Sequence, residues 1–164
     1  MEHMNRRLRL RPVTGDDLDL FFEHQSDVDA NRMAAFGAPD PSDRRAFMEK
    51  WQLRLGGGDA LCRTIEADDQ VAGYVAHFEQ LGTPSISYWL GRAFWNRRIA
   101  TDAVRMLLPA IEARPLFARI ASDNIASLKV LEHCGFAVVG KGRRFSDARG
   151  CDVEESVLAL PPDP

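Results

Sequence analysis

The sequence has few cysteines and no recognisable metal-binding spacing. It contains three cysteines (Cys62, Cys134 and Cys151), and no two of them form a C-x-x-C pair. The four histidines are equally scattered and lack the short spacing of metal ligands. Widely separated cysteines are typical of a reducing compartment. We therefore expect no metal and no disulfide framework.

Long apolar runs and an excess of positive charge are also missing. No stretch approaches the roughly 18 consecutive apolar residues of a membrane-spanning helix. Residues 1–12 contain no apolar core of a signal peptide. The net charge of −3 argues against a general nucleic-acid binder, which is normally basic. We expect a cytoplasmic protein that binds neither membranes nor nucleic acids.

The length and composition predict one domain spanning residues 1–164. With 45% hydrophobic residues, the chain is large enough for a proper core, and it has no repeat or long linker. Alternating and helical hydrophobic patterns then divide it into elements. In chain order they predict a strand at 7–12, helices from Thr14, within 26–36 and at 42–55, strands at 60–66, 70–79 and 85–91, a helix from about Arg98, a strand at 115–121, a helix at 124–134, and strands at 136–142 and 153–160. This order predicts an α+β domain around one mixed sheet.

Local signals refine several of these boundaries. Thr14 and Ser42 are expected N-caps, because a hydroxyl there accepts from the free N–H groups of a helix start. Pro109 should kink the helix that begins near Arg98 or end it early. On that helix, Ile99, Ala103 and Met106 are predicted to face the core. Phe136, after a helix-ending glycine, is a predicted core anchor.

Two adjacent arginines, Arg97 and Arg98, precede that helix in the stretch "FWNRRIATDA". A helix start has free N–H groups and a partial positive charge, so it favours an anion. The added arginines indicate something more negative than one carboxylate, such as a phosphate group. The alternative is that both are solvated loop residues.

Four stretches resemble one family, the GNAT acyl-CoA-dependent N-acetyltransferases, and within it the RimJ/RimL-like branch. They are "LRLRPVTGDDLDLFF", "SYWLGRAFWNRRIATDA", "NIASLKVLEHCGF" and "GCDVEESVLAL", in the family's order. The resemblance implies the GNAT fold, a mixed and mostly antiparallel central sheet flanked by helices. It also implies acetyl-CoA as co-substrate and an amine as acceptor.

The resemblance further implies a set of cofactor contacts. The pyrophosphate would meet N–H groups at the helix start, the pantetheine arm would pair with backbone of the preceding strand, and an asparagine side chain would bond the arm. The implied residues are Trp89, Leu90, Arg97, Arg98, Ile99, Ala100, Thr101, Asn124 and Ser127. Asn124 is equally explained as an N-cap, worth about 1 kcal/mol, and the two roles can coexist.

The chain departs from the family pattern at two sites. Asn96 and Arg98 replace glycines in the pyrophosphate loop. Asparagine tolerates the left-handed region but arginine does so poorly. The motif can still work if Arg98 keeps a helical φ and only its N–H faces the phosphate; otherwise acetyl-CoA would bind weakly or not at all. Leu131 replaces the tyrosine that protonates the departing CoA thiolate in many relatives.

The proton donor and the base must therefore be sought elsewhere. Ser127 is the nearest family-consistent acid. Glu79 is the candidate base, with His77 beside it on the same strand face. Tyr88 and Trp89 are expected to wall the acceptor cleft or to serve packing alone.

These features predict transfer of an acetyl group to a primary amine by direct attack in a ternary complex. A protein N-terminal α-amine is the favoured acceptor, because its pKa of about 7.7–8.0 leaves it partly neutral. A small-molecule amine such as a polyamine or antibiotic, and a catalytically silent CoA-binding domain, remain the alternatives. The sequence leaves monomer and homodimer both open.

Overall fold

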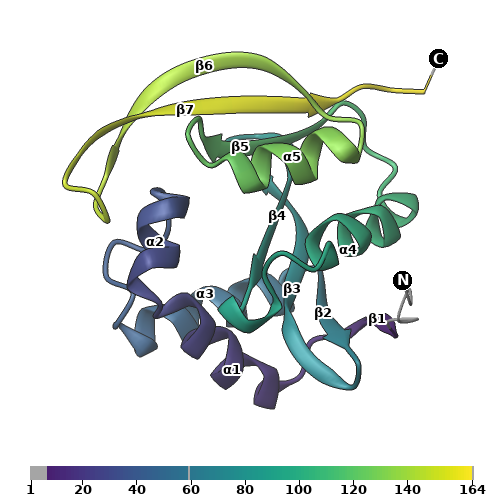
Figure 1. Ribbon diagram of the computed structural model, residues 1–164. Helices are drawn as coiled ribbons and strands as arrows, with labels where there is room; N and C mark the ends of the chain where they lie inside the picture. Colours follow the sequence, from purple (N-terminus) through teal and green to yellow (C-terminus); the bar gives the residue numbers. More distant parts are fainter. Residues whose placement is uncertain (1–6, 59, 164) are drawn as a thin grey trace.

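The computed structural model describes residues 7–58 and 60–163 (Figure 1). Residues 1–6, 59 and 164 lie outside the described residues, and so does half of the stretch judged above to lack a signal peptide. Helices and strands follow one another in the predicted order. They are β1 (Leu8–Pro12), α1 (Gly15–Gln25), α2 (Val28–Ala34), α3 (Arg44–Gly56), β2 (Leu61–Ala67), β3 (Gln70–Gln80), β4 (Thr83–Leu90), η1 (Arg92–Phe94), α4 (Ile99–Leu107), η2 (Leu108–Ala110), β5 (Leu116–Ala121), α5 (Ile125–His133), β6 (Ala137–Ser146) and β7 (Cys151–Leu160).

The strands form one mixed sheet in the order β1-β2-β3-β4-β5-β7-β6. All neighbouring pairs are antiparallel except β4 and β5, which are parallel. Ser85 and Phe117 are the one residue pair recorded between β4 and β5 in the described chain. Beyond Ser85, β4 continues beside β3 to Leu90, whereas β5 continues beside β7 to Ala121. The sheet therefore splits along this line, and β4 has an open edge (Figure 1).

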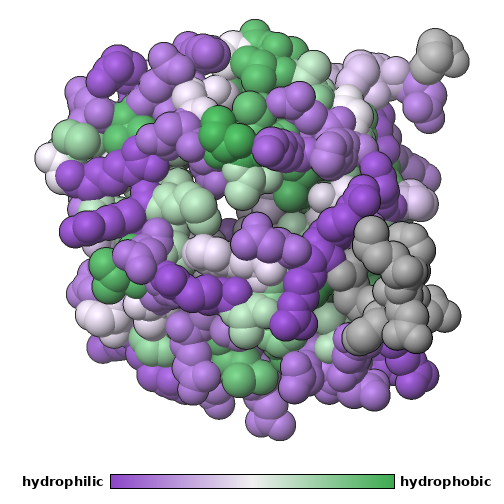
Figure 2. Space-filling model, in the orientation of Figure 1, coloured by the Kyte–Doolittle hydropathy of each residue, from purple (hydrophilic) through white to green (hydrophobic). Residues whose placement is uncertain are grey.

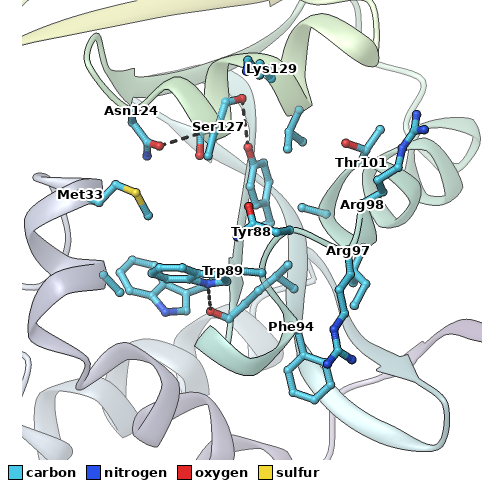
Figure 3. Close-up of a pocket in the computed structure, with 18 of the residues that line it drawn as sticks. Met33, Tyr88, Trp89, Phe94, Arg97, Arg98, Thr101, Asn124, Ser127 and Lys129 are labelled. Atoms are coloured by element: carbon cyan, nitrogen blue, oxygen red, sulfur yellow. Dashed lines mark hydrogen bonds between the residues drawn. The ribbon is translucent and has the colours of Figure 1, made fainter.

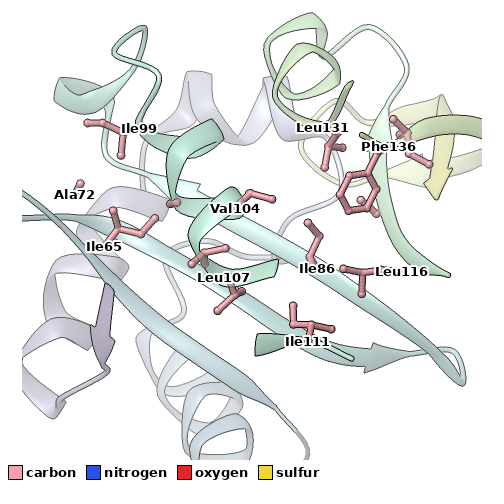
Figure 4. Close-up of a cluster of buried hydrophobic side chains, with 14 of the residues drawn as sticks. Ile65, Ala72, Ile86, Ile99, Val104, Leu107, Ile111, Leu116, Leu131 and Phe136 are labelled. Atoms are coloured by element: carbon pink, nitrogen blue, oxygen red, sulfur yellow. The ribbon is translucent and has the colours of Figure 1, made fainter. Parts of the chain in front are cut away.

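Helices cover both faces of the sheet. On one face α4 and α5 enclose the larger core, in which Ile65, Ile86, Val104, Leu116 and Leu131 pack together (Figure 4). On the other face α1 and α3 pack an aromatic cluster against β3. The ring centroids of Trp51 and Tyr74 lie 4.7 Å apart in that cluster.

An ion pair between a half-buried arginine and a buried carboxylate joins β1 to the start of α1. Asp17 accepts two hydrogen bonds from the Arg11 guanidinium, at 2.7 and 2.8 Å. It also accepts from the Thr14 backbone N–H and the Thr64 hydroxyl. Burial alone would raise the pKa of Asp17, but these donors outweigh it and lower the pKa to about 2.

Most local predictions are confirmed and a few are wrong. Thr14 is the N-cap of α1, and α4 ends at Leu107, two residues before Pro109. The cap of α3 is Asp43 rather than Ser42, because the Asp43 carboxylate accepts from the Ala46 N–H. Met106 is 45% exposed, and the neighbouring Leu107 takes the core position.

Candidate functional site

A cavity of about 510 Å³ lies where the sheet splits, between β4, α5, the start of α4 and α2 (Figure 3). In the space-filling view a hollow near the middle of the face is bordered by pale and green residues within a mostly hydrophilic surface (Figure 2). The cavity is lined by Ala30, Met33, Ala34, Tyr88, Trp89, Leu90, Phe94, Trp95, Asn96, Arg97, Arg98, Ile99, Ala100, Thr101, Asn124, Ala126, Ser127, Lys129, Val130 and His133. Every predicted cofactor residue is in this set.

The open edge of β4 supplies unpaired backbone groups to the cavity. Strand residues point their N–H and C=O groups alternately to the two sides. The Trp89 carbonyl points at β3, since a Cβ on Gly73 would lie 2.0 Å from its oxygen. The neighbouring Tyr88 and Leu90 therefore direct their amide groups to the open side. The Leu90 carbonyl already accepts from the Trp95 indole at 3.1 Å, which leaves the Leu90 N–H and both Tyr88 groups for a ligand.

Trp89 lines the cavity with its side chain, whereas its backbone was expected to pair with the pantetheine arm. Its backbone belongs to the β3–β4 pairing, and its side chain lines the cavity. The indole Nε1 donates to the His24 carbonyl at 3.2 Å, which ties the ring to the end of α1.

The start of α4 opens into the same cavity. The first hydrogen bond of the helix runs from the Asp102 N–H to the Arg98 carbonyl. The N–H groups of Ile99, Ala100 and Thr101 precede that bond, so they are available to an anion. No side chain caps this helix within the described residues.

Arg98 does not meet the condition of a helical φ. Arg98 has φ 60° and ψ 14°, in the left-handed region, and Asn96 has φ 61°. Both residues thus adopt the conformation that the family's glycines allow. The loop keeps its shape because Asn96 tolerates this region and Arg98 bears the steric cost.

The cavity lining is basic. Four basic residues line the cavity, namely Arg97, Arg98, Lys129 and His133. Among the described residues, no Asp or Glu lines it. The Arg97 guanidinium lies 5.9 Å from the centre of the Phe94 ring. Lys129 and His133 are one helical turn apart and line the cavity from α5, whereas Arg97 and Arg98 line it from the loop before α4. This balance suits a polyanion such as linked phosphates.

Three polar groups meet where β4 approaches α5. The Asn124 carboxamide oxygen accepts from the Ser127 N–H at 3.3 Å, which makes Asn124 the N-cap of α5. The Tyr88 hydroxyl donates to the Ser127 backbone carbonyl at 3.4 Å (Figure 3). Burial raises the pKa of Tyr88 to about 12, although the bond to Ser127 opposes the shift. The phenol therefore keeps its proton at neutral pH.

The end of the cavity beside α2 is apolar and held in place by ion pairs. Ala30, Met33 and Ala34 line it together with Trp89. Arg149, in the turn before β7, donates to the Met33 carbonyl at 3.3 Å and pairs with Asp123 at 2.6 Å. These contacts fix the end of α2 against the loop that precedes α5.

Other acidic groups near α2 are also paired. Arg92 contacts the carboxylates of Asp27 and Asp29 at 2.5 and 3.0 Å. The hydrogen bond from Arg92 holds the pKa of Asp27 below its usual value. Neither carboxylate lines the cavity.

The structure does not bring Glu79 to this site. Glu79 is exposed and pairs with Pro84 beside the β3–β4 turn. That is five residues along β4 from Trp89, or about 16 Å at the usual rise of a strand. His77 is likewise outside the lining, and its Nδ1 lies 3.1 Å from the Ser85 carbonyl. The position of Glu79 therefore gives no support to its predicted role as the base.

Leu131 also has no place in the cavity lining. Its side chain is fully buried in the larger core. Sequence reasoning missed Lys129 and His133, although their helical spacing from Ala126 was a usable signal. It also missed Met33, for which no local signal exists because α2 reaches the site only through the fold.

Within residues 7–58 and 60–163, no group of three or more His, Cys, Asp or Glu side chains could hold a metal ion. No helix of that part is long and apolar enough to span a membrane.

Comparison with known proteins gives concordant results. The profile of the acetyltransferase (GNAT) domain matches residues 7–137. The uncharacterized N-acetyltransferase p20 of Bacillus licheniformis is 25% identical over 164 residues, covering 94% of this chain and 92% of that protein. A putative phosphinothricin N-acetyltransferase has a similar structure, with a TM-score of 0.79, 20% identity, and coverage of 96% of this chain and 100% of that one. Mycobacterium smegmatis RimJ, solved with a CoA disulfide, has a TM-score of 0.74 and 23% identity, with coverage of 94% and 81%.

Proposed function

The chain belongs to the GNAT acetyltransferase family, and on that premise we propose that it acetylates protein N-terminal α-amines with acetyl-CoA. Within the family we assign it to the RimJ/RimL-like branch. The whole chain would act as a single acetyltransferase domain. The amine would attack the thioester directly, in a ternary complex.

The cavity has the features that acetyl-CoA requires. The N–H groups of residues 99–101 and the charges of Arg97, Arg98 and Lys129 suit its phosphates. The open amide groups of Tyr88 and Leu90 suit the amides of the pantetheine arm. Asn124 keeps its carboxamide nitrogen for the same arm while its oxygen caps α5. When bound, acetyl-CoA supplies the activated acetyl thioester.

We choose the α-amine as acceptor because no carboxylate lines the cavity among the described residues. A lysine or polyamine nitrogen, with a pKa near 10.4, is almost fully protonated at neutral pH and needs a strong base. A terminal α-amine, at about 7.7–8.0, is partly neutral already. A site without a carboxylate base suits the α-amine, with water as the proton acceptor. The basic lining also disfavours polycations.

The departing thiolate needs a proton donor near α5. Two hydroxyl groups lie there, those of Ser127 and Tyr88. Ser127 is the donor that the family pattern favours, and Tyr88 is considered below.

A thiol-release assay tests the proposed acceptor. Acetyl-CoA would be offered with peptides that have a free N-terminus and a lysine, and with the same peptides blocked at the N-terminus. A polyamine and an aminoglycoside complete the panel. We expect turnover of the free peptides and not of the blocked ones.

The other outcomes identify the alternatives. Turnover restricted to the polyamine or the aminoglycoside would replace the proposal with a small-molecule amine acetyltransferase. Tight acetyl-CoA binding without turnover of any amine would indicate a catalytically silent domain.

We further propose a cytoplasmic location. All three cysteines are free thiols, as a reducing compartment maintains them. A homodimer stays a prediction, which light scattering of the purified protein would check.

A further inference from the structure

Tyr88 is the residue whose hydroxyl enters the cavity from the sheet. Side chains alternate along β4, so Tyr88 shares the α4 and α5 face with Ile86 and Leu90. Ile86 is buried in the core there, next to the last pairing with β5 at Ser85. Tyr88 lies past that pairing, and its ring crosses the space that β5 has left (Figure 3). Its hydroxyl thereby reaches α5 at Ser127.

The hydroxyl is held loosely in this position. Its hydrogen bond to the Ser127 carbonyl is 3.4 Å long, against about 2.7–2.8 Å for a strong O–H···O bond. The carbonyl already belongs to a helix, so it loses little if the phenol turns to another acceptor. Tyr88 can therefore exchange this bond for one to a ligand atom beside it.

The proposed course of acetyl-CoA brings its sulfur toward this hydroxyl. The phosphates would lie at the start of α4, which follows the Leu90 end of β4. An arm that pairs with the open edge then runs from Leu90 back toward Tyr88. Leu131, one turn beyond Ser127 on α5, is buried in the core and offers no donor.

We propose that Tyr88 is the catalytic residue that protonates the departing CoA sulfur, in place of the tyrosine missing at Leu131. The inference rests on the proposed acetyl transfer, but not on which amine accepts the group. As the amine nitrogen forms its bond to the acetyl carbon, the carbon–sulfur bond breaks and the electron pair of that bond goes to sulfur. Tyr88 gives its proton to the sulfur, and the proton that the nitrogen loses to water is passed on and restores the phenol. The net result is transfer of one proton from nitrogen to sulfur.

The ionisation of Tyr88 agrees with this role. Its raised pKa keeps the hydroxyl protonated over the physiological range, so a proton is present at each turnover. Return of a proton from the acetylated nitrogen in the same step avoids a free phenolate.

Two substitutions test the proposal with a matched control. Tyr88→Phe removes one oxygen and keeps the ring. Tyr74→Phe makes the same change at the only other tyrosine of the chain, in the aromatic cluster on the opposite face of the sheet. With whichever amine the parent acetylates best, Tyr88→Phe should lower kcat about a hundredfold and change the KM for acetyl-CoA little. Tyr74→Phe should leave both unchanged.

A second measurement does not depend on turnover. The pKa of the thiol of bound CoA can be followed by the ultraviolet absorbance of its thiolate. If the Tyr88 hydroxyl donates to that sulfur, Tyr88→Phe should raise the pKa of the bound thiol by about one to two units. Thermal unfolding confirms that both variants fold.

The proposal is overturned if kcat of Tyr88→Phe matches that of Tyr74→Phe. It is also overturned if kcat falls while the pKa of the bound thiol stays the same, since the phenol would then only support α5. A larger loss and a larger thiol shift for Ser127→Ala would identify the serine as the donor. Failure of the α-amine acceptor is a separate result, because these measurements use any amine that is turned over.

Discussion

Arg98 offers a sharp test because its backbone conformation should lower the stability of the fold, whereas its charge should strengthen the binding of acetyl-CoA. Its left-handed φ of 60° costs a residue with a Cβ about 1–2 kcal/mol relative to the right-handed region. Glycine adopts this φ without that cost but is more flexible in the unfolded chain. We therefore expect Arg98→Gly to raise the free energy of unfolding by about 0.5–1 kcal/mol, or Tm by about 1–4 °C. Arg98→Ala keeps a Cβ at the same φ and should gain nothing.

Both substitutions remove the same guanidinium. If Arg98 contacts the phosphates of acetyl-CoA, each variant should bind it about tenfold more weakly, with the difference shrinking as salt rises. Their kcat should change little, because the phosphates are far from the thioester. Thermal unfolding and calorimetric titration of the three proteins provide both measurements. The strain argument is refuted if the Gly variant is no more stable than the Ala variant, and the charge argument is refuted if the Gly variant binds as tightly as the parent.

Three further predictions concern the cofactor, the cap of α5 and the β1–α1 ion pair. Acetyl-CoA should raise Tm, because it binds only the folded state; no shift at millimolar concentration would contradict the proposed site. Asn124→Ala should cost about 1 kcal/mol of stability through the lost cap, and should weaken acetyl-CoA binding by more than this when both are measured on one preparation. The pKa of Asp17 is lowered to about 2 in the folded protein, so its stabilising effect is present above pH 4 and lost as the pH falls toward 2. Asp17→Asn should be less stable at neutral pH and lose less stability than the parent over that acid range, as denaturant titrations would show.

The sequence predicted those parts of the fold that local chemistry determines. Pro109 cannot continue a helix, and α4 ends just before it. The α3 cap was misplaced by one residue because Ser42 and Asp43 are both good caps. Met106 and Leu107 are adjacent and both apolar, so only packing decides which one the core takes.

The residues of the candidate site were predictable only where they lie next to a feature that is visible in the sequence itself. Arg97 to Thr101 and Asn124 are next to helix starts, and a helix start is visible in the sequence. Glu79 lies away from the cavity, which the sequence could not show because alternation gives the face of a strand but not the position along the sheet. The role of Tyr88 depends on the place where β4 and β5 separate, and that place is set by contacts between distant residues.

The separation of β4 from β5 divides the sheet into two blocks of strands, and we call the unpaired line between them the seam. Strands β1–β4 and strands β5–β7 are each joined by antiparallel ladders, but the two blocks share a single backbone pair in the described chain. A ligand lying in the seam substitutes for the missing strand pairing, so binding and cohesion of the two blocks are coupled. Amide hydrogen exchange should thus slow along the β4 edge when acetyl-CoA binds. If the chain were cut in the connection between Ala110 and Leu116, we expect the two fragments to reassemble more readily with acetyl-CoA than without it.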